Sequence, residues 1–157
     1  MDLTDLLAPN GVIVSMDATC KKQALQELAE AAAQITGLDG REIFDTLLQR
    51  ERLGSTGLGR GIAIPHIKSK QLDRIVCLFG RLDEAIDFEA HDSQPVDLIF
   101  LLLAPEHASG DHLKALARIS RLVREPANLE NLRSANDAKA VRAVLAGGQV
   151  ATSSHAA

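Results

Sequence analysis

Aromatic residues and net positive charge are both scarce in this sequence. Its 157 residues include four Phe and neither Trp nor Tyr, which leaves few rings on which the bases of a nucleic acid can stack. The formal net charge of −4 at pH 7 lacks the basic excess of a nucleic-acid-binding protein. We therefore expect no nucleic-acid partner.

Cysteine and long apolar segments are scarce as well. Cys20 and Cys77 form neither a Cys-x-x-Cys motif nor the framework of a disulfide-rich secreted domain. The longest apolar run, residues 98–104, is much shorter than a membrane span. Residues 1–5 are acidic, unlike the basic start of a signal peptide. We expect a protein of the reducing cytoplasm with no membrane insertion.

The residues that are plentiful predict one α/β domain with helices packed on a sheet. Hydrophobic residues make up 46% of the chain, enough to bury a core in a domain of this length. Apolar residues recur at helical spacing up to Ile35, which predicts a helix capped by Asp17 or Thr19. A second helix is predicted between Asp39 and Gly54. The apolar run 96–103 is long enough for the middle of a sheet. Further strands are expected at 12–14, 62–64 and 74–79, with a turn at 9–11 and a connection at 83–95. Further helices are expected at 112–124, 127–133 and 137–145. Residues 147–157 are expected to form a disordered tail.

The segment from Arg50 to Lys68 is the most distinctive part of the chain. It holds glycines at positions 54, 57, 59 and 61, followed by a short apolar run and a Pro-His pair. A Walker phosphate-binding loop requires a Lys directly after its glycines, and here none comes before Lys68. The dinucleotide fingerprint requires a third glycine where Ile62 stands. Nucleotide binding is therefore disfavoured, and a flexible surface loop remains the plain alternative.

His66 is the candidate reactive residue. Pro65 fixes its own φ and restricts Ile64 to extended geometry, so the histidine follows a rigid segment. Backbone N–H groups of a glycine loop can hold an oxyanion. A neutral imidazole is a nucleophile at pH 7, and its attack on phosphorus gives a phosphohistidine. The alternative is an ordinary structural histidine.

His112 and Arg50 are the candidate supporting residues. His112 begins a helix and can project toward the end of the sheet, although a surface histidine in a first turn is the simpler interpretation. Arg50 can hold a phosphoryl oxygen, or it can simply suit the C-terminal end of a helix dipole. No histidine has a His or Cys partner at metal-ligand spacing, so we expect no metal and no cofactor.

Residues 54–66, Gly-Ser-Thr-Gly-Leu-Gly-Arg-Gly-Ile-Ala-Ile-Pro-His, resemble the active-site signature of a known family. They are similar to the fructose/mannitol-type enzyme IIA proteins of the bacterial phosphoenolpyruvate phosphotransferase system, and nearest to the nitrogen-regulatory branch. The likeness covers roughly residues 1–146 and includes the segments 4–7, 87–88, 94–98 and 112–116.

This resemblance implies a three-layer α/β/α sandwich in which a mixed β-sheet has helices on both faces. It implies that His66 accepts a phosphoryl group on Nε2 from a phosphohistidine of an HPr-like carrier, with Nδ1 oriented by a backbone carbonyl. Arg50 and His112 match the other two active-site residues of the family. Loop N–H groups at Ser55, Thr56 and Gly57 are expected to stabilise the phosphoryl group. The chain would then be a transient phosphocarrier rather than a free-standing turnover enzyme.

Three functions remain open from the sequence. The first is a cytoplasmic phosphocarrier with a regulatory output of the nitrogen or potassium type. The second is a sugar-specific enzyme IIA that passes phosphate to a IIB domain for uptake of fructose- or mannitol-type sugars. The third is a ligand or interaction domain that uses the same scaffold without phosphoryl transfer.

Overall fold

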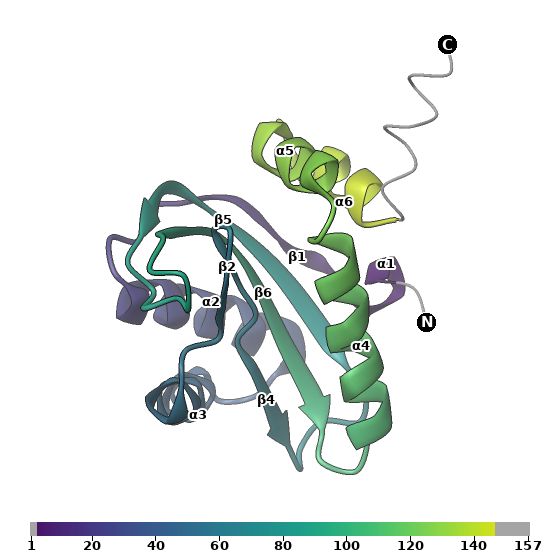
Figure 1. Ribbon diagram of the computed structural model, residues 1–157. Helices are drawn as coiled ribbons and strands as arrows, with labels where there is room; N and C mark the ends of the chain where they lie inside the picture. Colours follow the sequence, from purple (N-terminus) through teal and green to yellow (C-terminus); the bar gives the residue numbers. More distant parts are fainter. Residues whose placement is uncertain (1–2, 147–157) are drawn as a thin grey trace.

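A mixed six-stranded β-sheet forms the centre of the computed structural model, which describes residues 3–146 (Figure 1). The strand order is β1-β5-β6-β3-β2, and β4 also pairs with β6. β6 runs antiparallel to β5 and parallel to both β3 and β4. The strands are β1 Leu7–Met16, β2 Gly57–Gly59, β3 Ile62–Ala63, β4 His66–Ser69, β5 Val76–Ile86 and β6 Val96–Pro105.

Helices cover both faces of the sheet, which confirms the predicted α/β fold with helices on each side (Figure 1). One layer contains α2 (Lys21–Thr36) and α3 (Gly40–Leu53). Between them, Gly37 adopts a φ of 79°, which ends α2 in the left-handed conformation that glycine tolerates best. The other layer contains α1 (Leu3–Leu6), α4 (Ser109–Leu122), α5 (Pro126–Ser134) and α6 (Ala138–Leu145).

β6 is the central strand, as its long apolar run predicts. Successive strand residues point to opposite faces of a sheet. Ile99, Leu101 and Leu103 accordingly lie in the core beneath α2 and α3, whereas Phe100 and Leu102 lie in the core beneath α4 to α6. Both faces are therefore covered, and the strand has no polar face to expose.

The largest differences from the expected strand boundaries are in β5 and β1. β5 does not end at residue 79 but continues to Ile86, within the segment expected to be a connection, because Arg81 and Ile86 still pair with β6. Gly80 lets the strand pass close to Met16 in this stretch. β1 includes residues 9–11, where a turn was expected, and its pairing with β5 shifts register there. This irregularity accommodates the Pro-Asn-Gly sequence inside a strand.

Several smaller expectations are also corrected. The N-cap of α2 is Cys20, rather than Asp17 or Thr19, and α4 starts at Ser109 instead of residue 112. β2 and β4 are short strands within segments that showed no strand pattern of their own. The expected disordered tail, residues 147–157, lies outside the described residues. Among the helices of residues 3–146, none combines the length and apolarity needed to cross a membrane.

Candidate active site

His66 is the first residue of β4, directly after the Ile64-Pro65 dipeptide. Its Nδ1 lies 2.8 Å from the carbonyl oxygen of Ile64. A carbonyl can only accept a hydrogen bond, so Nδ1 carries the proton and Nε2 keeps its lone pair. The amide of Leu102 donates to the carbonyl of Pro65 at 2.9 Å, which anchors the turn to the central strand. The contact with the main chain thus leaves Nε2 of the half-buried His66 as the ring nitrogen with a free lone pair.

His112, in the first turn of α4, lies beside His66. The two ring centroids are 5.4 Å apart and the ring planes are inclined at 65°. The His112 side chain is only 5% exposed, and its Nε2 has no hydrogen-bond partner among the described residues. Burial lowers the pKa of His112, and the neighbouring His66 and Lys68 lower that pKa further. His112 therefore presents a neutral ring with an unsatisfied nitrogen.

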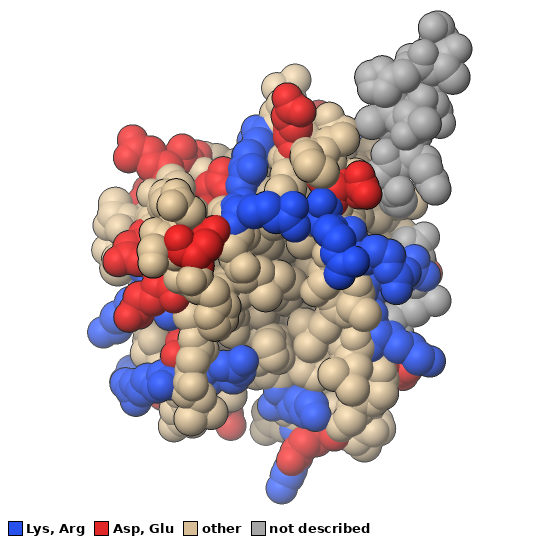
Figure 2. All heavy atoms as spheres, in the orientation of Figure 1, with Lys and Arg blue, Asp and Glu red and all other residues tan. Residues whose placement is uncertain are grey.

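A pocket of about 540 Å³ joins these histidines to Arg50. α3 contributes Arg50 and Leu53, β4 contributes His66 and Lys68, and α4 contributes His112. α3 and α4 belong to different layers, and β4 runs between them in the view of Figure 1. In the same orientation, Figure 2 shows a largely uncharged hollow with Lys and Arg side chains above and below it. No carboxylate of the described residues lines this pocket.

Arg50 lies in the last turn of α3, as the sequence predicts. Its Nη1 donates to the carbonyl oxygen of Gly54 at 2.9 Å. This bond holds the guanidinium near the end of the helix and still leaves other N–H donors on the side chain. The three residues expected to act together therefore line one pocket, although they are separated by up to 62 positions in the chain (112 − 50).

The loop residues Ser55, Thr56 and Gly57 have a different environment. The N–H of Thr56 donates to the Glu51 carboxylate at 3.2 Å, and the N–H of Gly57 donates to Ser55 Oγ at 3.0 Å. Two of the three amides expected to stabilise a phosphoryl group are thus used within the loop, and none of the three residues lines the pocket. A Cβ at position 57 would lie 2.8 Å from that of Ala90, which explains the glycine there by close packing.

Glu51 is a buried charge that was not singled out in the sequence. Its carboxylate accepts from the hydroxyl and the N–H of Thr56 and pairs with Lys21 Nζ at 2.7 Å. Lys21 in turn lies 4.8 Å from the centre of the Phe88 ring. These contacts fasten the glycine loop to both α2 and α3. The sequence does contain a signal for this burial. Glu51 follows Ile43 and Leu47 at four-residue spacing, which places it on the apolar face of α3.

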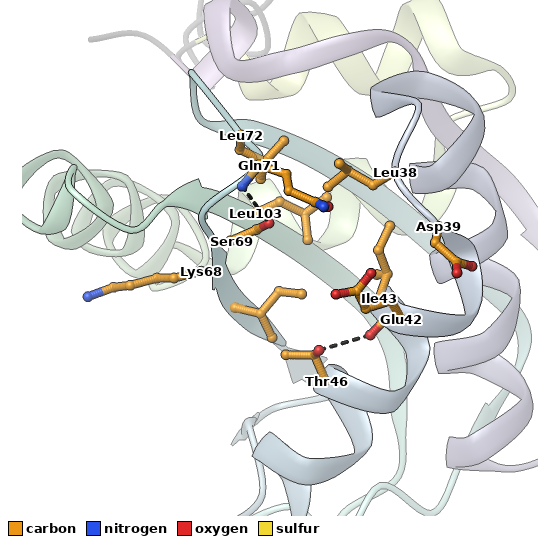
Figure 3. A pocket seen from close by; sticks show the side chains of 11 residues that line it. Leu38, Asp39, Glu42, Ile43, Thr46, Lys68, Ser69, Gln71, Leu72 and Leu103 are labelled. Carbon is orange, nitrogen blue, oxygen red and sulfur yellow. Dashed lines mark hydrogen bonds between the residues drawn. The ribbon is translucent and has the colours of Figure 1, made fainter.

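A second, narrower pocket lies between α3 and the connection from β4 to β5 (Figure 3). Its lining includes Ile43, Ser69 and Leu103 but neither His66 nor His112. Within residues 3–146, no group of three or more His, Cys, Asp or Glu side chains is arranged to hold a metal ion.

Comparisons with known proteins show the family of this chain. The family described as phosphoenolpyruvate-dependent sugar phosphotransferase system, EIIA 2, matches residues 5–147, and the chain belongs to it. A nitrogen regulatory protein of Bradyrhizobium diazoefficiens is 56% identical over 146 residues, which cover 93% of this chain and 95% of that protein. The crystal structure of nitrogen regulatory protein IIA-Ntr from Neisseria meningitidis matches with a TM-score of 0.87 at 34% identity, over 91% of this chain and 98% of that one. The fructose-specific EIIA component of Haloferax volcanii is 35% identical over 150 residues, 93% of this chain and 97% of that protein.

The lowered pKa of His112 predicts a pH dependence of stability. In the unfolded chain a histidine titrates near ~6.5. As the pH falls below that value, the unfolded state binds a proton that the folded state resists, so the free energy of unfolding decreases. The loss continues until the pH reaches the lower, folded-state pKa.

Urea unfolding of wild type and His112→Gln between pH 5 and 7.5 measures this contribution. We expect the stability of the wild type to fall more steeply on acidification than that of the variant. Equal slopes would contradict the assignment of a neutral, buried His112.

Proposed function

We propose that this chain is a phosphocarrier that accepts a phosphoryl group on Nε2 of His66 from the phosphohistidine of an HPr-like protein. The bond from phosphorus to the donor nitrogen breaks as the bond to Nε2 forms. Nδ1 keeps its hydrogen bond to Ile64 throughout, so the ring does not have to turn. Membership of the phosphotransferase family and the geometry of the two histidines support this reaction.

The observation that carries the proposal is the unpartnered, buried Nε2 of His112 next to His66. Burying a polar group without a hydrogen bond costs about 1–3 kcal/mol. A phosphoryl group on His66 supplies acceptor oxygens and roughly two negative charges near this nitrogen. Those charges favour protonation of His112, which then donates a charge-assisted hydrogen bond. The buried Nε2 of His112 would thus gain a hydrogen-bond partner when an anionic group occupies the pocket.

Arg50 supports the same reaction from the opposite side of the pocket. Phosphoryl transfer passes through a loose transition state whose charge is spread over the equatorial oxygens. Catalysis is therefore mainly positioning and electrostatic stabilisation. The Arg50 guanidinium is held at the end of α3, and the His112 ring is held on α4. Because both groups already line the pocket, neither has to rearrange as charge develops.

We propose a regulatory output in the cytoplasm. Its support is the likeness over nearly the whole chain to proteins named nitrogen regulatory protein. The alternative is a sugar-specific enzyme IIA, which the fructose-specific relative favours. Efficient transfer from the phosphorylated chain to the cysteine of a IIB domain would favour transport, whereas a stable phosphoprotein in the presence of IIB domains would favour regulation.

The test is incubation of the chain with phosphoenolpyruvate, enzyme I and an HPr-like carrier. We expect one phosphoryl group per chain, labile in acid and stable in alkali. His112→Ala should slow its formation by about 100-fold, because one donor to the transition state is lost. Thermal unfolding confirms that the variant is folded. A wild-type chain that stays unphosphorylated, or an undiminished rate in His112→Ala, would contradict the proposed site.

A further inference from the structure

Lys68 shares with His66 the side of β4 that faces the active-site pocket. The two residues are separated by two positions in the strand, so their side chains leave the same face. Ile67, between them, points the other way and packs in the core beneath α2 and α3. Lys68 also borders the narrow pocket beside α3, but Figure 3 shows its side chain extending away from that pocket.

The side chain of Lys68 extends from β4 to the start of α4. Its Nζ donates to Ser109 Oγ at 3.0 Å, and Ser109 is the first residue of the helix that carries His112. Lys68 also lines the pocket together with Arg50, His66 and His112. The exposed Lys68 side chain is thus held at the pocket by a hydrogen bond to a neutral hydroxyl.

The charge of Lys68 has no ion-pair partner among residues 3–146. No Asp or Glu carboxylate in the described part of the chain lies within ion-pair distance of its Nζ. Lys21, by contrast, pairs with Glu51 at 2.7 Å. The positive charge of Lys68 also acts on His112, because it disfavours protonation of that ring and lowers its pKa. An uncompensated cation in a pocket without carboxylates is suited to an anionic group.

We propose that Lys68 is a further catalytic residue, whose ammonium leaves Ser109 and contacts the phosphoryl oxygens as the group reaches His66. This inference rests on the proposed phosphocarrier function. It gives the phosphoryl group three cationic or protonated donors from three elements, namely Arg50 on α3, Lys68 on β4 and His112 on α4. A charge-assisted hydrogen bond to a phosphoryl oxygen is stronger than the present bond to a hydroxyl, which favours the exchange.

The experiment compares Lys68→Gln, Lys68→Arg and the matched control Lys139→Gln, which removes the same charge from an exposed position on α6. Each chain is phosphorylated by the HPr-like carrier and, separately, by phosphoramidate, a small donor that needs no docking surface. We expect Lys68→Gln to accept the phosphoryl group about tenfold more slowly from both donors. Lys68→Arg should keep most of the rate, and Lys139→Gln all of it. Histidine NMR titration should show a higher His112 pKa in Lys68→Gln.

The two donors separate the failure of this inference from that of the proposed function. Wild-type rates retained by Lys68→Gln with both donors would overturn the role of Lys68 while leaving the phosphocarrier intact. An equal slowing in Lys139→Gln would also overturn it, since general charge would then explain the effect. A wild-type chain phosphorylated by phosphoramidate but not by the carrier would overturn the proposed donor, and the Lys68 comparison would still be made. No phosphorylation by either donor would overturn both.

Discussion

His66→Ala should take up no phosphoryl group from the carrier, under conditions in which the wild type is fully phosphorylated. The variant lacks the Nε2 nucleophile that the Ile64 carbonyl holds in the reactive tautomer. His112 cannot replace it, because its own Nε2 is buried and its ring is fixed on a different element. Intact-protein mass spectrometry after incubation with phosphoenolpyruvate and the carrier proteins measures the outcome.

His91→Ala is the matched control for this experiment. His91 is an exposed histidine outside the pocket, so its loss should leave phosphorylation unchanged. His66 is half-buried at a strand end, and we expect the His66→Ala chain to remain folded by circular dichroism. Phosphorylation of His66→Ala at the wild-type level would show that another residue is the acceptor.

Glu51→Ala should lower the free energy of unfolding by about 3 kcal/mol. The substitution leaves the largely buried Lys21 with only its 3.5 Å contact to the exposed carboxylate of Glu89, and it removes the acceptor of the Thr56 hydroxyl and amide. Breaking a buried pair by deleting one partner is costly, because the remaining charge is still desolvated. For a chain of this length, the loss corresponds to a melting temperature lower by about 10 °C. Denaturant and thermal unfolding measure both quantities.

Glu30→Ala provides the comparison for Glu51→Ala. Glu30 is an exposed glutamate of α2, and we expect its loss to change stability by less than ~0.5 kcal/mol. Glu51→Gln keeps an acceptor for Thr56 while losing the charge opposite Lys21, so it should fall between the two. If Glu51→Ala were as stable as Glu30→Ala, the buried network would not be what holds the loop.

The fold class follows from the sequence for identifiable reasons, whereas the roles of the site residues stay predictions. Local signals place the helix ends at Gly37, Asp39 and Gly54, and the apolar run of β6 identifies the central strand. The signature of residues 54–66 predicts His66 as the phosphoryl acceptor, and the likeness to the family predicts Arg50 and His112 as its partners. The structure brings these three to one pocket.

The features that the sequence does not predict depend on contacts between distant segments. β4 is only four residues long and is a strand because it pairs with β6, some 36 positions away (102 − 66). The amides of Thr56 and Gly57 are engaged by Glu51 and Ser55, which the glycine pattern does not indicate. Lys68 is placed over the pocket only once β4 is known to be a strand.

The pairing of β4 with β6 has a consequence for the chemistry. In the described sheet β4 pairs only with β6. In this parallel pairing, His66 lies opposite Leu102. A slip of one residue would turn His66 and Lys68 toward the α3 layer and bring Ile67 to the face of His112. Whether an imidazole or an isoleucine lies next to His112 is therefore decided by the alignment of backbone peptide groups in two paired strands.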